Sequence, residues 1–75
     1  MVNFNKWVVI RENYQKLRNF FMQNQGKWFQ FRDDKSMTLM GQLVDLLDEG
    51  TFVLKTRDGQ SHDVHPSQIL GAYVA

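Results

Sequence analysis

The spacing of hydrophobic and polar residues changes near Gly26, and this change divides the chain into two predicted parts. Before Gly26, apolar residues recur every three or four positions, which is the period of a helix with one apolar face: Trp7, Ile10, Tyr14, Leu17 and Phe21. After Gly26, apolar and polar residues alternate, which is the period of strands with one buried face. The pattern therefore predicts an amphipathic helix over about residues 4–25 and a region of strands over about residues 27–75.

Turn signals divide the second part into five predicted strands. The first runs from Trp28 to a turn at 33–36, and the others cover residues 37–47, 51–57, 61–64 and 69–74. Gly41 predicts a bend in the long second strand. The Asp-Gly pair at positions 58 and 59 predicts a two-residue hairpin, because it supplies positive φ values. Residues 66–68 form one further tight turn, and the last strand has an edge that we expect to be free.

These elements predict one domain over residues 1–75, mainly β with one N-terminal α-helix. Its fold class is a small, bent, five-stranded antiparallel barrel of the SH3-like class. Packing of the helix seam on the sheet is the most economical way to bury both apolar faces. A coiled-coil contact, or docking of the helix in a groove of another molecule, would bury the same seam.

The composition indicates a small folded protein that gains from association. The chain has 75 residues, 43% of them hydrophobic, and a monomer of this size has difficulty burying six Phe, two Trp and two Tyr. It has no cysteine, so a reducing compartment, the cytoplasm, is expected, and neither disulfides nor thiolate zinc sites are available. No apolar run is long enough to cross a membrane.

Charge is distributed unevenly although the net charge is only +1. Residues 1–27 carry five cations and one carboxylate, a net charge of +4, whereas residues 28–75 carry four cations and seven carboxylates, a net charge of −3. The predicted helix is thus basic and the predicted sheet acidic. Such an asymmetry steers an anionic partner to one face, pairs one subunit with another, or simply solvates a small surface.

The arrangement of these elements resembles the Sm-like family, including its bacterial Hfq branch. The resemblance covers roughly residues 14–74. Its closest local matches are the apolar-x-Gly-x-apolar strand at residues 39–43, and Asp48 followed by the apolar strand at residues 52–55. The family resemblance implies a homo-oligomeric closed ring in which strands four and five of neighbouring copies pair, which would cover two exposed sheet edges.

The same resemblance implies a non-enzymatic protein that binds single-stranded RNA, as an RNA chaperone or regulator does. Carried over by position, two turns face a central pore, and a basic helical face adds phosphate contacts. The candidate RNA-binding residues are Asp48, Thr51, Phe52, His65, Ser67, Gln68, Arg11, Lys16 and Arg18. Four features differ from the family: one residue too many separates Gly41 from Asp48, no Asn follows the Asp48 turn, His65-Pro66-Ser67-Gln68 stands where Hfq has a Lys-His pair, and the helix is longer than the family usually carries.

An alternative function from a different class is a small SH3-like protein-interaction module or phage-type regulator, which binds a protein partner through its aromatic helix or a sheet edge and does not bind RNA. The run His62-Asp63-Val64-His65 contains metal-ligand residue types, but on a strand only Asp63 and His65 share a face. We therefore predict no metal site and no cofactor. We also predict no catalytic residues, because nothing in the chain resembles a nucleophile elbow, a phosphate-binding glycine-rich loop or a paired-carboxylate cleft.

Overall fold

The computed structural model describes residues 4–72 of the chain, with side chains described from residue 13 onward. A long helix, α1 (Phe4–Asn24), precedes the sheet. The strands are β1 (Trp28–Arg32), β2 (Thr38–Leu46), β3 (Phe52–Lys55), β4 (Ser61–Val64) and β5 (Ile69–Ala72), and the 3₁₀ helix η1 (Pro66–Gln68) joins the last two. These bounds confirm the predicted helix and strands. Residues 73 and 74 of the predicted last strand lie outside the described residues.

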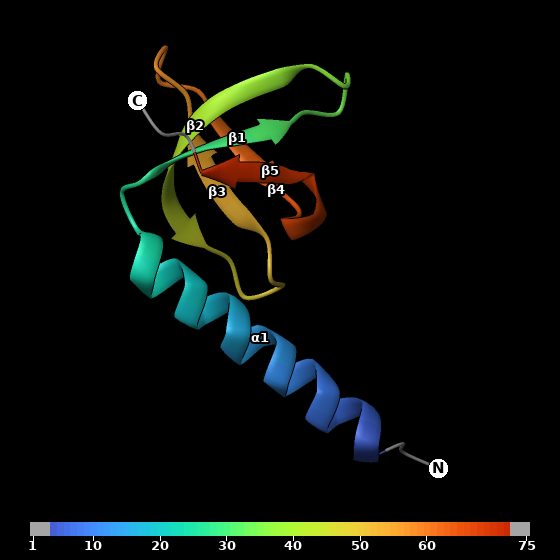
Figure 1. Ribbon diagram of the computed structural model, residues 1–75. Coiled ribbons are helices and arrows are strands. Elements are labelled where there is room, and N and C mark those ends of the chain that lie inside the picture. Colours follow the sequence, from blue (N-terminus) through green and yellow to red (C-terminus); the bar gives the residue numbers. More distant parts are fainter. Residues whose placement is uncertain (1–3, 73–75) are drawn as a thin grey trace.

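The strands form one antiparallel sheet with the order β4-β3-β2-β1-β5, and Figure 1 shows how strongly it curls. Within residues 4–72 the sheet is not closed, so the prediction of a complete barrel is wrong on this point. A hollow of about 320 Å³ is lined by residues of β4 and by Phe31 of β1. The edge strands β4 and β5 have four residues each. The helix η1 connects them along the chain, but no strand pairing joins the two edges in the described part of the chain.

The bend of β2 has two structural causes. Gly41 is buried, and a Cβ at this position would lie 3.0 Å from Leu54 Cβ and 3.0 Å from Phe31 Cε1, so only glycine permits this approach without movement of the neighbours. The register with β3 then shifts between Leu43 and Asp45, which leaves Val44 as a β-bulge. The predicted bend at Gly41 is thus accompanied by a bulge three residues later.

The three hairpins of the sheet use the same three-residue loop. In each, the residue before the loop donates its N–H to the carbonyl after the loop: Asp33 to Met37, Leu47 to Thr51, and Thr56 to Gln60. The last loop residue has a positive φ in every case: 63° at Ser36, 88° at Gly50 and 87° at Gly59. The predicted two-residue hairpin at residues 58 and 59 is therefore wrong, because Arg57 also belongs to the loop and only Gly59 of the pair has a positive φ.

The core lies inside the curl of the sheet and is covered by the C-terminal part of α1. Its fully buried residues come from four strands: Phe29, Phe31, Leu43, Phe52, Leu54 and Val64. Leu17 and Phe21 pack against this core, and the Phe20 ring centroid lies 5.6 Å from those of Phe29 and Phe52. The N-terminal part of the helix extends away from the sheet (Figure 1). The predicted packing of the seam on the sheet therefore holds for its C-terminal part.

The helix ends at Asn24, and Gly26 is the stop that the sequence predicts. This glycine has a φ of 85° and donates its N–H to the Leu43 carbonyl at 2.8 Å, while Gln42 Nε2 donates to the Gly26 carbonyl at 2.9 Å. These bonds attach the helix exit to the middle of β2. Within the described residues, no helix combines the length and the apolar character needed to cross a membrane.

Candidate nucleic-acid interface

Most of the residues that sequence reasoning selected lie at one end of the β3–β4 ladder. Phe52, the first residue of β3, pairs with Val64, the last residue of β4. The loop before β3 and the helix η1 after β4 therefore lie at the same end of the sheet, which we call the turn end. The structure thus brings together two candidate turns that are separated in the sequence.

The polar side chains of η1 bind one another. His65 Nδ1 accepts from the Ser67 N–H at 3.2 Å and lies 2.7 Å from Ser67 Oγ. Gln68 Oε1 accepts from the His65 N–H at 2.8 Å, so the two side chains form a capping box around Pro66. Gln68 Nε2 donates to the Arg32 carbonyl at 2.9 Å, which fastens η1 to the end of β1. Three candidate residues therefore have a structural role at the turn end.

The loop before β3 offers a different surface. Asp48 and Glu49 are exposed, Thr51 is half-buried, and Phe52 is only 1% exposed inside the core. Stacking of a base needs an accessible ring face, which Phe52 does not offer in this fold. The accessible groups of this loop are carboxylates, and these repel phosphate.

Two of the candidate cations, Lys16 and Arg18, belong to the part of α1 that packs at the turn end. Leu17 packs near Gly50, where a Cβ would lie 3.2 Å from Leu17 Cδ1. Lys16 and Arg18 flank Leu17 in the sequence and are exposed. Arg11 belongs to α1, but its side chain lies outside those that the structure describes. The helix therefore adds two described cations near the acidic loop.

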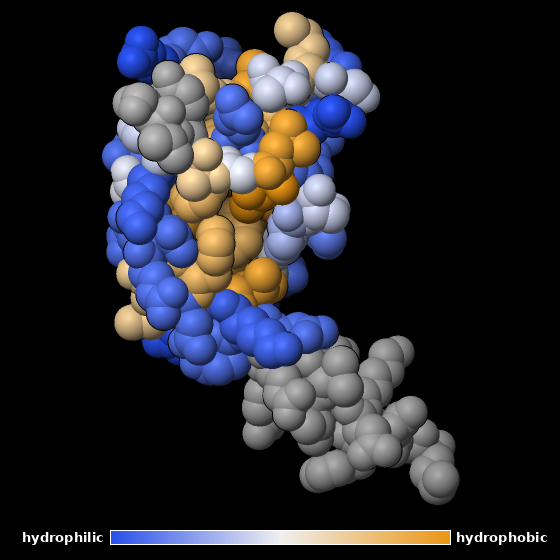
Figure 2. Space-filling view, viewed as in Figure 1, coloured by the Kyte–Doolittle hydropathy of each residue, from blue (hydrophilic) through white to orange (hydrophobic). Residues whose placement is uncertain are grey.

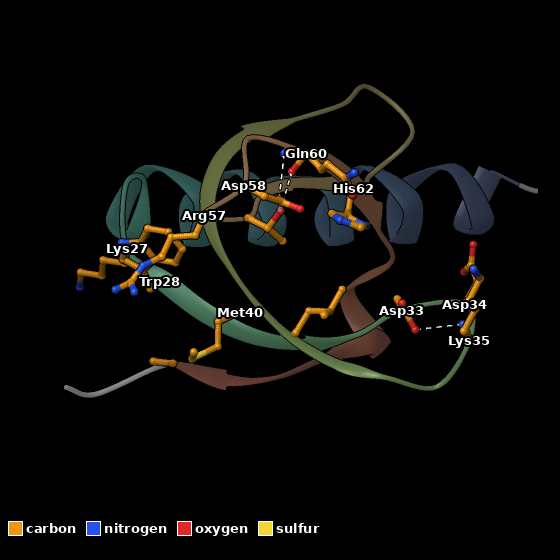
Figure 3. Close-up of a pocket in the computed structure, with 13 residues that line it drawn as sticks. Lys27, Trp28, Asp33, Asp34, Lys35, Met40, Arg57, Asp58, Gln60 and His62 are labelled. Carbon is orange, nitrogen blue, oxygen red and sulfur yellow. Dashed lines mark hydrogen bonds between the residues drawn. The ribbon is translucent and has the colours of Figure 1, made fainter.

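A groove of about 1110 Å³ opens at the opposite end of the β3–β4 ladder, which we call the groove end (Figure 3). Lys55 pairs with Ser61 at this end, and the loop that follows β3 forms part of the groove wall. Lys27, Trp28 and Arg57 lie together at one extremity in Figure 3, and Asp33, Asp34 and Lys35 lie at the other. The groove thus has a cationic, aromatic extremity and an acidic one.

The loop at the groove end is organised by Asp58. Its carboxylate accepts hydrogen bonds from the Thr56 hydroxyl and, at 3.3 Å, from the Gln60 N–H. The Thr56 hydrogen bond, followed by that of Gln60, holds the pKa of Asp58 below its ordinary value of 3.8. The carboxylate is therefore ionised at neutral pH, and part of its acceptor capacity is used within the loop.

Sequence reasoning did not select the groove. Trp28 precedes buried Phe29 in a strand of period two, so the alternation placed it on the face opposite to the core. The position of Trp28 next to the cation Lys27 was a further sequence signal that could have pointed to the groove. Arg57 joins them only through the β1–β2–β3 register, in which Trp28 pairs with Gln42 and Gln42 pairs with Lys55.

The two histidines of the 62–65 run have separate surroundings. The His62 ring packs against Phe31, with ring centroids 5.4 Å apart, whereas His65 caps η1. Among the residues that the structure describes, no group of three His, Cys, Asp or Glu side chains is placed to hold a metal ion.

Comparison with known proteins assigns no family to this chain. No protein-family model matches the sequence, and no curated protein or solved structure gives a significant match. The fold class that the structure establishes is a mainly β domain with one helix and, in the described part, a five-stranded antiparallel sheet.

Proposed function

We propose that this chain binds single-stranded RNA without catalysing a reaction, as a homo-oligomeric ring of Sm-like subunits. The observation that carries the proposal is the strand order, because it makes β4 and β5 the two edges of the described sheet. These are the two strands that an Sm-like ring pairs between neighbouring copies. Pairing them would satisfy the backbone groups that each edge exposes.

Two further features support the proposal. The loop before β3 and η1 lie at the same end of the sheet, which is where the family resemblance locates its pore-facing turns. The bulge at Val44 adds one residue to β2 between Gly41 and the Asp48 turn. The bulge therefore explains why the spacing between this glycine and this turn is one residue longer than in the family pattern. The bulge does not change the strand order.

The edge strand β5 supplies a sharp test of the assembly. Leu70 lies on β5 and is 50% exposed, so Leu70→Lys places a charge on the proposed interface, as natural edge strands do to prevent pairing. Met22→Lys makes the same kind of change on α1, where Met22 is 67% exposed. Light scattering should give an oligomer of fixed size for the wild type and the Met22 variant, and dissociation for the Leu70 variant.

RNA binding is measured on the same three proteins with fluorescently labelled U-rich and A-rich strands. We expect affinity to fall as salt rises, because phosphate contacts release counterions. The Leu70 variant should bind more weakly, since a ring repeats each weak contact around the strand. A wild-type monomer that ignores RNA up to high micromolar concentration would reject the proposal.

A second candidate function is binding of a protein partner by the same edge. It is favoured by an exposed apolar side chain on this edge, since Leu70 of β5 is 50% exposed. Figure 2 shows apolar side chains gathered over the middle of the face that β5 crosses, with hydrophilic residues around them. A monomer that binds no RNA but adds a peptide strand at β5 would establish this function instead.

A further inference from the structure

We infer that the cationic extremity of the groove is a second RNA contact, which holds one nucleotide with its base against Trp28 and its phosphate on Lys27 and Arg57. This inference rests on the proposed RNA binding and adds to it a site away from the turn end. The inference is supported by the placement of these side chains, the shape of the groove, and the distribution of charge along the groove.

The three side chains reach one place from two parts of the chain. Trp28 begins β1 and Lys27 precedes it, and Arg57 comes from the loop between β3 and β4. All three line the groove, and Figure 3 shows them at the same extremity of it. Trp28 is half-buried, so part of its side chain remains accessible, while Lys27 and Arg57 are exposed. An indole face flanked by cations is what an unpaired base and its phosphate require.

The groove is large enough and partly apolar. Its volume of about 1110 Å³ slightly exceeds the range for small-molecule sites, so a nucleotide fits within part of it. Leu39 and Met40 of β2 contribute apolar side chains to its lining. Met40 is 44% exposed, and its flexible thioether adapts to the shape of a planar ligand.

The charge distribution limits how far an RNA strand extends into the groove. Asp33 and Asp34 lie at the opposite extremity, where they repel phosphate, and Lys35 offsets only one of them. Asp58 follows Arg57 and is ionised as well, so Lys27, Arg57 and Asp58 together carry a net charge of +1, against −1 for Asp33, Asp34 and Lys35. The groove therefore favours one nucleotide at the Trp28 extremity, with the strand leaving away from Asp33 and Asp34.

Trp28 makes this site directly observable. In a Trp7→Phe protein it is the only tryptophan, so its fluorescence reports on its own surroundings. We expect a hexauridylate strand to quench this emission, because a base stacks on the indole. Binding is measured independently by the anisotropy of the labelled strand. The chain offers a matched pair of variants, Arg57→Ala at the cationic extremity and Lys35→Ala at the acidic one.

Arg57→Ala should weaken hexauridylate binding roughly fivefold and lower the log–log salt slope by about 0.7, the contribution of one phosphate contact on a single strand. Lys35→Ala should change affinity less than about twofold, since Lys35 is remote from the bound nucleotide. Arg57→Lys should retain most of the affinity, because it keeps the positive charge. Thermal melts serve as the control that all variants are folded.

The outcomes separate this inference from the proposed function. Anisotropy that shows binding while Trp28 emission is unchanged, with equal effects of Arg57→Ala and Lys35→Ala, would overturn the groove site and leave RNA binding at the turn end. Absence of binding in both measurements would overturn both. Quenching that depends on Arg57 and not on Lys35 would establish the site.

Discussion

The two ends of the β3–β4 ladder use polar residues differently. At the turn end, His65, Ser67 and Gln68 hydrogen-bond to one another and to the backbone, so they hold η1 in place. At the groove end, Lys27 and Arg57 are exposed beside a half-buried Trp28. A polar residue type therefore does not by itself indicate a binding role, because its hydrogen-bond partners decide whether it is available to a ligand.

Loss of the Phe52 ring should have the largest effect and should act on the turn end. Phe52 is 1% exposed, so Phe52→Ala is expected to lower the free energy of unfolding by about 3–5 kcal/mol through lost burial and a cavity. Val53→Ala is the matched control, since Val53 is only half-buried. Urea titration measures both. A loss below about 1 kcal/mol for Phe52→Ala would show that this residue is not part of the core.

The two loop glycines allow a direct comparison of the ends. Gly50→Ala and Gly59→Ala both place a side chain at a positive φ, which costs about 1–2 kcal/mol. At Gly50 the added Cβ would also lie 3.2 Å from Leu17 Cδ1, whereas nothing lies within 4 Å at Gly59. Denaturant unfolding should therefore show a larger loss for Gly50→Ala. Equal losses would mean that α1 does not pack against the turn end.

Substitution of two glutamines tests whether polar side chains stabilise the fold more at the turn end than at the groove end. Gln68→Ala removes two hydrogen bonds, and at about 0.5–1.5 kcal/mol each the expected loss is about 1–3 kcal/mol. Gln60 contributes only backbone groups to the hydrogen bonds of its loop, so Gln60→Ala should cost less than about 0.5 kcal/mol. Thermal unfolding of the two variants compares them. A reversed order would contradict the assignment of Gln68 to the fold.

The smallest effect concerns pH at the groove end. Since hydrogen bonds lower the pKa of Asp58 in the folded protein below 3.8, its contribution to stability is present above that pH and is lost as pH falls through the folded pKa. Asp58→Asn and Thr56→Val should both flatten the dependence of the urea midpoint on pH below about 4. Curves parallel to the wild type would show that this hydrogen bond does not favour the ionised carboxylate.

Local patterns predicted the elements of this fold well. The helical spacing predicted α1 to its last turn, because Gly26 adopts a positive φ that ends the helix. Alternation and turn residues predicted the strands. The loop type at residues 57–59 was not predictable from Asp-Gly alone, because the register of the flanking strands decides how many residues enter the loop.

Features that depend on contacts between distant segments were not predictable from these patterns. The bulge at Val44 arises where β2 changes partner from β1 to β3. The bond from Gln68 to the Arg32 carbonyl, and the meeting of Trp28 with Arg57 in the groove, likewise need the complete sheet. For the same reason, sequence reasoning, which took the turn-end residues from their position in the family resemblance, did not detect the groove.

Native mass spectrometry of the wild-type chain mixed with one short U-rich strand tests the central claim most directly, because one spectrum reports both the subunit number and bound RNA. The account predicts a species whose protein mass is a fixed multiple of 8.9 kDa and which carries RNA. It also predicts that the same multiple persists without RNA, since strand pairing holds the ring. A spectrum of 8.9 kDa monomer with no RNA attached would contradict the account.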